Sequence, residues 1–217
     1  MADAAVRLVM LGPPGAGKGT QAERLARDRG IPRISTGDIL RAAVLGQTDV
    51  GRAAKAIMSA GRLVNDDVVI GIVRERLAQP DAARGFVLDG FPRTLVQAET
   101  LDDLVEHWSP LVIVDIEVPE GTLVERLSKR QICSVCGTTA PTGVTRCPKC
   151  GGGLVQRSDD DVEVIRERLQ VYQRDSRSIV EFYRRRPTFR SVDGDQPENL
   201  VAADIAAAIA SVEGVRR

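Results

Sequence analysis

The chain has 217 residues, 43% of them hydrophobic, which is enough to bury one substantial core and to carry a small appendage. Its 30 basic and 30 acidic residues cancel and aromatic residues make up only 3%, so neither a global positive field for nucleic acid nor a base-stacking surface is expected. No apolar run reaches the length of a membrane span and no N-terminal secretory segment is recognisable, so we expect a soluble, cytoplasmic protein without a membrane partner.

The first informative stretch is an apolar run, residues 5–11, that leads into Gly-Pro-Pro-Gly-Ala-Gly-Lys-Gly-Thr at 12–20. The spacing from Gly12 to Lys18 matches a phosphate-binding loop, although the strict pattern places Ser or Thr where this chain has Gly19. Glycines let consecutive backbone N–H groups face an anion, and a helix that begins near the lysine points its positive end at the same place. A plain strand-to-helix turn would require neither the lysine nor the buried strand before it.

Helical spacing of apolar residues continues after the loop, and glycine, proline and capping residues mark where the elements change. Ser35 or Thr36 can cap the helix that carries Arg41, and Thr36 taken alone fits a cap as well as a ligand contact. We therefore expect, in chain order, a helix that ends at Gly30, a strand over 31–35, helix through residues 36–60, a break at 61–64, and a helix that Asn65 or Asp66 caps and that runs to Leu77.

A second informative junction spans residues 85–93, where Phe-Val-Leu-Asp is followed by Gly-Phe-Pro-Arg. The four-residue run predicts a buried strand whose carboxyl end delivers Asp89 to the crevice where open α/β sheets bind ligands. Arg93 is expected to open the following helix, with Gln97 one turn further along the same face. By themselves these residues also fit a plainer interpretation, in which Asp89 caps that helix and Arg93 is a surface charge.

The clearest buried strand covers residues 111–116, where apolar residues follow one another rather than alternate, as in a parallel sheet with both faces covered. Strands that alternate with helices at this rhythm predict an α/β fold with a doubly wound parallel sheet. After this strand we expect a helix over 120–130, a long helix from 162 to about 186, a strand over 188–192, and a closing helix that includes Leu200 and Val212.

All four cysteines lie in an insert, residues 131–156, that is poor in large apolar side chains. Two Cys-x-x-Cys pairs give the spacing of a zinc ribbon, with the ligands Cys133, Cys136, Cys147 and Cys150. Four thiolates leave zinc no open position, so such a site is structural; an iron centre and unmetallated thiols are the alternatives. A nucleic-acid-binding ribbon is the weaker interpretation, because only Arg146 and Lys149 are basic between the outer cysteines and no aromatic residue lies there.

Together these motifs resemble the adenylate kinases, in the long-lid form whose lid carries four zinc ligands, and the likeness covers nearly the whole chain. It rests on residues 12–21, Ser35-Thr-Gly-Asp-Ile-Leu-Arg41, Asp89-Gly-Phe-Pro-Arg-Thr94 with Gln97, Arg157-x-Asp-Asp160 and Asp193-Gly194. The resemblance implies a five-stranded sheet of the P-loop NTPase type. It also implies a core of residues 1–34, 65–126 and 164–217, a helical AMP-binding insert of residues 35–64, and a zinc-ribbon lid of residues 127–163.

The activity implied by the resemblance is reversible transfer of the terminal phosphoryl group of Mg-ATP to AMP, which gives two ADP and balances the adenine nucleotides. The residues implied to act on the transferring group are Lys18, Arg93, Arg126, Arg130, Arg157 and Arg168. Those implied to bind ATP are Gly12, Gly15, Ala16, Gly17, Lys18, Gly19, Thr20, Arg126 and Gln196. Those implied to bind AMP are Thr36, Arg41, Arg62, Leu63, Val64, Gly90, Phe91, Arg93, Gln97, Arg157 and Arg168. The implied cofactors are structural Zn²⁺ and a Mg²⁺ held by the nucleotide phosphates and by waters near Asp89.

Two features depart from the usual pattern of these kinases. The family's Gly-Arg-Arg before the first cysteine is here Lys129-Arg130-Gln131, and the insert is several residues shorter between the cysteine pairs. The alternatives are a sibling enzyme, either a UMP/CMP kinase or a GTP-dependent AMP kinase, and a non-catalytic nucleotide switch or zinc-ribbon nucleic-acid protein. Thr36 with Arg41 favours AMP among the sibling enzymes, and the last alternative leaves Asp-Gly-Phe-Pro-Arg unexplained. We expect a monomer whose partners are ATP, AMP and ADP, with no nucleic acid.

Overall fold

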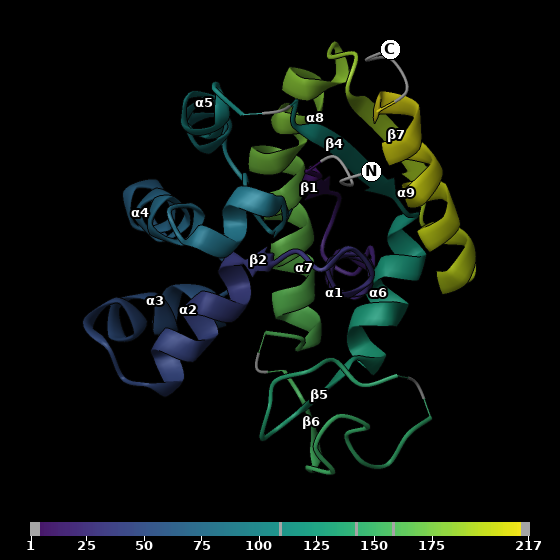
Figure 1. Ribbon diagram of the computed structural model, residues 1–217. Helices are drawn as coiled ribbons and strands as arrows, with labels where there is room; N and C mark the ends of the chain where they lie inside the picture. The colour runs from purple at the N-terminus through teal and green to yellow at the C-terminus, as the bar shows by residue number, and fades with distance from the viewer. Residues whose placement is uncertain (1–4, 109, 142, 158, 214–217) are drawn as a thin grey trace.

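The computed structural model describes residues 5–108, 110–141, 143–157 and 159–213 (Figure 1). Five strands form one parallel sheet in the order β2-β3-β1-β4-β7. These strands are β1 (Arg7–Leu11), β2 (Arg33–Ser35), β3 (Phe86–Asp89), β4 (Val112–Glu117) and β7 (Phe189–Asp193). The predicted doubly wound, five-stranded parallel sheet is therefore confirmed, and its short second strand begins at Arg33 rather than at Ile31.

Helices cover the sheet, and a separate antiparallel pair of strands lies away from it (Figure 1). The helices are α1 (Lys18–Arg29), α2 (Thr36–Leu45), α3 (Asp49–Ser59), α4 (Asp66–Leu77), α5 (Leu95–Val105), α6 (Glu120–Lys129), α7 (Val162–Val171), α8 (Arg177–Arg184) and α9 (Glu198–Glu213). The separate pair is β5 (Gln131–Cys133) and β6 (Leu154–Gln156). None of the helices within the described ranges combines the length and the hydropathy needed to cross a bilayer.

The central strand β1 shows why both faces of the sheet are covered. All of its residues are buried, and alternate residues enter two different cores. Leu8 and Met10 pack with residues of α1, α6 and α9, whereas Val9 and Leu11 pack with residues of α4, α5 and α8. Because Met10 of β1 pairs with Asp89 of β3, the two loops that follow these strands leave the sheet side by side at its carboxyl edge.

The alanine-rich stretch 42–60, expected as one continuous helix, is instead divided between α2 and α3. Helix α2 ends at Leu45, and Gln47 takes a left-handed conformation with φ of 52°. Thr48 then caps α3, because its side chain accepts a hydrogen bond from the backbone N–H of Gly51 at 3.1 Å. The two helices therefore form a hairpin beside the sheet (Figure 1).

Two further predicted boundaries are corrected. Arg93 does not open α5: Thr94 is the N-cap, and its hydroxyl accepts from the backbone N–H of Gln97 at 3.2 Å. The interpretation in which Asp89 caps this helix is therefore wrong. The long helix expected from residue 162 is interrupted by a π-helical turn, Tyr172–Ser176, between α7 and α8.

Two segments project from the layered core, the α2–α3 hairpin and the β5–β6 strand pair (Figure 1). They fall within the predicted AMP-binding insert, residues 35–64, and the predicted lid, residues 127–163. The assignment of these ranges as domains stays a prediction.

The packing of the α2–α3 hairpin depends on Gly51, because a Cβ atom there would overlap the backbone of Ala43 in α2. We expect Gly51→Ala to lower the free energy of unfolding by about 1–3 kcal/mol, the usual effect of overpacking. Gly71→Ala is the matched control, since a Cβ at this exposed position in α4 meets no atom within 4 Å. The control should be neutral or slightly stabilising, because alanine favours helix more than glycine does. Equal denaturant midpoints for the two variants would contradict this account.

Candidate functional site

The loop between β1 and α1 takes a conformation that depends on its glycines. Gly12, Gly15 and Gly17 have φ values of 129°, 88° and 91°, a region that favours glycine. A Cβ at Gly12 would also lie 2.6 Å from the carbonyl oxygen of Ile116 in β4. The loop can therefore lie against the end of the sheet while α1 begins at Lys18 and directs its free backbone N–H groups toward the same space.

The side chain of Lys18 folds back over this loop. Its Nζ donates hydrogen bonds to the carbonyl oxygens of Gly12 at 2.7 Å and Pro13 at 2.8 Å. Burial lowers the pKa of Lys18 to about 7, against the attraction of Asp89 and together with the repulsion of Arg93. The ammonium group thus lies where an additional anion would stabilise its charged form.

Beside the loop is a cavity of about 1440 Å³ that reaches from the carboxyl edge of the sheet to both projecting segments. Its walls carry basic side chains from many separate elements of the chain: Lys18, Arg24, Arg27, Arg33, Arg41, Lys55, Arg62, Arg93, Lys149, Arg157 and Arg168. The other predicted site residues that line it are Gly12, Gly15, Gly17, Gly19, Thr20, Thr36, Leu63, Val64, Asp89, Gly90, Gln97, Cys133 and Cys136. The cavity therefore unites the phosphate loop with most of the arginines from distant motifs.

The turn after β3 is built around the carbonyl oxygen of Gly90. It accepts hydrogen bonds from Thr36 Oγ1 and from Arg93 Nε, both at 2.8 Å. Burial and the charge of Arg168 lower the pKa of Arg93 to about 10. Gln97 is only 1% exposed, and its Oε1 accepts from the backbone N–H of Arg93 at 2.8 Å. Its Nε2 donates to a carboxylate oxygen of Asp66 at 2.7 Å, so protein groups already use both ends of this amide.

Asp160 is fully buried and holds one arginine next to the β5–β6 pair, Arg130, and one in the last turn of α7, Arg168. Arg130 donates two hydrogen bonds to its carboxylate at 2.7 and 2.5 Å, and Arg168 donates one at 2.8 Å. Arg157 is different: within the described part of the chain its buried Nε has no hydrogen-bond partner. Burial and the nearby charges of Arg130 and Arg41 lower the pKa of Arg157 to about 10.

Some predicted site residues lie away from the cavity. Arg126 lies 3.7 Å from a carboxylate oxygen of Asp195, and Gln196 donates to Asp204 at 2.6 Å. Arg130 is held by Asp160, as described above, and does not line the cavity. Ala16 and Phe91 are buried in the cores instead. The structure therefore separates the predicted adenine contact and two lid-side arginines from the arginines that converge.

Sequence reasoning missed Arg33, which lines the cavity from the start of β2. Its Nη2 donates to Asp89 Oδ2 at 2.5 Å. The one signal it offered was a basic residue at the start of a short strand, close to the Ser-Thr-Gly-Asp motif, and that spacing belongs to no phosphate-binding pattern.

Sequence comparison with known proteins shows which family the chain belongs to. A sequence profile of the adenylate kinase family matches residues 10–188, which is most of the chain. The chain belongs to the adenylate kinase family. Adenylate kinase of Archaeoglobus fulgidus is 44% identical over 216 residues, covering 96% of this chain and 100% of the relative. Those of Desulfitobacterium hafniense and Bacillus subtilis are 47% and 46% identical over 208 residues, covering 92% of this chain and 96% of each relative.

In this family member the four cysteines come together at the β5–β6 pair. Their sulfur atoms all lie within 4.8 Å of one another, with Cys133 and Cys150 at 3.4 Å and Cys136 and Cys147 at 3.6 Å. Four sulfurs around one zinc ion with bonds of about 2.3 Å form a tetrahedron with edges of about 3.8 Å. The donor set and its size therefore fit one tetrahedral metal ion.

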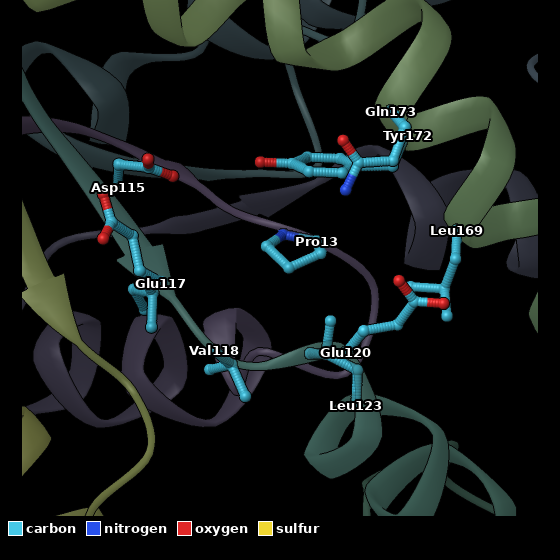
Figure 2. Close-up of a pocket in the computed structure, with 10 residues that line it drawn as sticks. Pro13, Asp115, Glu117, Val118, Glu120, Leu123, Leu169, Tyr172 and Gln173 are labelled. Carbon is cyan, nitrogen blue, oxygen red and sulfur yellow. The ribbon is translucent and has the colours of Figure 1, made fainter.

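A second, smaller cavity of about 170 Å³ lies behind the phosphate loop, with Pro13 in its wall (Figure 2). Asp115 of β4 and Tyr172 of the π-helical turn line it from different elements, and the hydroxyl end of Tyr172 points toward the side where Asp115 lies (Figure 2). Asp115 is 4% exposed, and no described residue donates a hydrogen bond to its buried Oδ1. Burial, with the charge of Glu117, raises the pKa of Asp115 to about 6.

The raised pKa of Asp115 makes the protein's stability depend on pH. Because the folded state favours the neutral acid, ionisation destabilises the fold above the ordinary pKa of 3.8, and fully above about 6. We expect Asp115→Asn to raise the free energy of unfolding by about 1–3 kcal/mol at pH 7.5. The gain should shrink as the pH falls from 6 to 4. Asp103→Asn, at an exposed position on α5, should change stability little at any of these pH values. Loss of stability in Asp115→Asn at pH 7.5 would contradict this account.

Proposed function

We propose that this adenylate kinase family member transfers the terminal phosphoryl group of Mg-ATP to AMP, reversibly, and forms two ADP. The observation that carries the proposal is that one cavity is lined both by the phosphate loop and by Thr36, Arg41 and Arg93. A cavity with so many basic residues in its walls suits two nucleotides that meet through their phosphates.

For ATP, we propose that the backbone N–H groups of the loop from Gly12 to Thr20 bind the phosphates and that Lys18 reaches the terminal ones. Lys18 is already beside the loop, and because burial lowers its pKa, a phosphate bound there would stabilise its charged form. Asp89 lines the same part of the cavity, and one carboxylate with phosphate oxygens and waters forms the oxygen-rich set that Mg²⁺ prefers. Mg²⁺ bound there would offset negative charge on the phosphates of ATP.

For AMP, we propose that Arg41 and Arg93 bind the phosphate, because a guanidinium group donates two parallel hydrogen bonds to phosphate and stays charged. The segment of Arg62, Leu63 and Val64 lines the cavity between α3 and α4 and would cover the nucleoside. Both ends of the Gln97 amide already have protein partners, so Gln97 would act on AMP indirectly. It would hold Arg93 in place by accepting a hydrogen bond from the backbone N–H of that residue. Thr36, Gly90 and Phe91 belong to the same proposed AMP side.

The chemistry requires positioning and charge compensation more than proton transfer. The attacking oxygen of the AMP phosphate is already anionic, so no general base is needed. The chain's lone histidine, His107, is exposed and does not line the cavity. We propose that Arg157 and Arg168, together with Arg93, surround the phosphoryl group while it moves between the nucleotides.

The projecting segment with the cysteines would act as a lid that excludes water. We propose that its movement over the cavity brings Arg130 to the phosphates, and that the bound nucleotide meets Arg126 and Gln196 from the core; these three residues lie outside the cavity here. We also propose that one structural Zn²⁺ binds Cys133, Cys136, Cys147 and Cys150. The cytoplasmic location, the monomeric state and the absence of a nucleic-acid partner stay predictions from the sequence.

The direct test of the proposed function is to mix the protein with Mg-ATP and AMP and to follow all three nucleotides. Two ADP formed per ATP consumed, with AMP consumed in equal amount, is the expected result. Faster turnover with UMP or CMP in place of AMP, or with GTP in place of ATP, would favour a sibling enzyme instead. ATP hydrolysis that does not need an acceptor would favour a nucleotide switch.

Removing a single arginine or lysine from this cavity should affect the transition state. We expect Arg93→Ala and Lys18→Ala each to lower kcat by at least about 100-fold, as loss of one donor to developing charge does. Arg74→Ala, at an exposed position on α4, is the matched control and should keep native kcat. Thermal unfolding should confirm that all three variants fold. Near-native turnover of either cavity variant would count against its assigned role.

If the four cysteines bind a structural zinc ion, its loss should lower thermal stability more than it lowers the affinity for AMP. Elemental analysis should find about one zinc ion per chain, and Cys147→Ser should reduce it to a trace. The variant should unfold at a lower temperature, because a small strand pair without a large apolar core depends on the metal. Its affinity for AMP should stay within about two-fold of native, since Thr36, Arg41 and Arg93 lie outside the β5–β6 segment. Thr145→Ala, at an exposed position between the two cysteine pairs that does not line the cavity, is the control. Equal loss of lid stability and AMP affinity would contradict a separate lid.

A further inference from the structure

Arg33, at the start of β2, contacts three carboxylates. Its Nη2 donates to Asp89 Oδ2 at 2.5 Å and lies 2.9 Å from Asp38 Oδ2, and its Nη1 lies 3.5 Å from a carboxylate oxygen of Glu23. The Arg33 side chain is 22% exposed, and that of Asp89 is 11% exposed. The Arg33–Asp89 contact is therefore partly shielded from water, where charge-assisted hydrogen bonds are strong, whereas the side chains of Asp38 and Glu23 are 41% and 57% exposed.

The contacts continue from Asp38 to the residue proposed to bind the AMP phosphate. Asp38 Oδ1 accepts a hydrogen bond from Arg41 Nη2 at 2.5 Å, while its other oxygen faces Arg33. Asp89, Arg33, Asp38 and Arg41 thus form an unbroken series of alternating charges. We call these four residues the charge series.

The two ends of the charge series lie beside two glycines that line the cavity, Gly19 of the phosphate loop and Gly37 of α2. A Cβ built on Gly19 would lie 3.2 Å from Arg33 Nη2 and 3.4 Å from Asp89 Oδ2, so this first ion pair lies directly against the phosphate loop. At the other end, a Cβ on Gly37 would lie 3.1 Å from Arg41 Nη2, within the segment proposed to bind AMP. The charge series therefore joins the ATP side of the cavity to the AMP side.

We propose that Arg33 is a positioning residue that couples Mg-ATP binding to AMP binding through this charge series, a proposal that rests on the proposed function. Asp89 would help to hold Mg²⁺, and a carboxylate engaged in that way would be less available to the guanidinium of Arg33. Arg33 then donates more fully to Asp38, whose charge it shares with Arg41. Arg41 is held less tightly by Asp38 and is freer to bind the phosphate of AMP.

This mechanism requires a difference between ATP with the metal and ATP without it. Nucleotide alone leaves Asp89 paired with Arg33, whereas the metal draws the carboxylate away. The effect must also be reciprocal, so that AMP strengthens the binding of Mg²⁺ to the ATP complex by the same factor. A guanidinium that only stabilised the fold would change neither quantity.

The test measures the affinity for AMP calorimetrically at saturating concentrations of a non-hydrolysable ATP analogue, with and without Mg²⁺. Saturation with the analogue keeps AMP out of the ATP site. For the native chain we expect Mg²⁺ to tighten AMP binding at least about five-fold, the lower range of measured couplings. We call the dissociation constant of AMP without Mg²⁺ divided by that with Mg²⁺ the ratio. For Arg33→Gln we expect this ratio to fall below about two, because the link between Asp89 and Asp38 is lost. Arg33→Lys keeps one charge but not the fork, and should retain only part of the ratio.

Arg76→Gln is the matched control. Arg76 is 27% exposed, pairs with Asp81 through two hydrogen bonds of 2.8 and 2.7 Å, and does not line the cavity. The Arg76→Gln variant loses a comparable ion pair, and its ratio of AMP dissociation constants should equal that of the native chain. If Arg33→Gln does not fold, Asp38→Asn interrupts the same charge series at its next member and should abolish the ratio in the same way.

A native ratio near one, or a native-like ratio in folded Arg33→Gln, overturns the coupling proposal. Formation of ADP from ATP and AMP by the same native preparation distinguishes the two proposals. If ADP forms and the ratio persists without Arg33, only the coupling fails. If no ADP forms, the proposed function itself fails.

Discussion

Positive charge that is kept from water is the constraint on which the large cavity of this molecule depends. Lys18, Arg93 and Arg157 are each buried enough for their pKa values to fall well below those of the free side chains. Such a group is stable only where acidic partners or a bound anion compensate it. Here Asp160 satisfies Arg130 and Arg168, and Asp89 pairs with Arg33, but Arg157 Nε has no hydrogen-bond partner among the described residues. The remaining compensation is what phosphate groups would provide.

The fold provides this concentration of charge by bringing distant segments to one edge of the sheet. Parallel pairing of β1 with β3 places the phosphate loop next to Asp89, and the side chain of Arg33, from the start of the short strand β2, reaches the same carboxylate. The turn after β3 then fixes Arg93 through the carbonyl oxygen of Gly90. No single element could hold so many cations, because neighbouring charges on one helix would repel one another without any gain in packing.

The balance between acidic and basic groups also differs between the two sides of the phosphate loop. In front of the loop the cavity has an excess of basic groups, whereas the small cavity behind it contains Asp115, whose pKa is raised rather than lowered. Lys18 lies near enough to both regions for Asp89 and Asp115 to favour its charge. A loop with this charge distribution favours an anion on one side only.

The sequence by itself determined the local features of this protein. The glycines and Lys18 of the loop, the apolar strand before them and the spacing of the cysteines each depend on neighbours in the chain, so the phosphate loop, the parallel sheet and the family could be inferred directly. The break between α2 and α3 was missed although Thr48 and Gly51 carried its signal, because alanine favours helix over the whole stretch. Only the tertiary structure decided which arginines converge, that Asp160 holds Arg130 away from the cavity, and that Arg33 lies between Asp89 and Asp38. Charges act through space, and the distances between them depend on strand order and helix packing, which no spacing along the chain records.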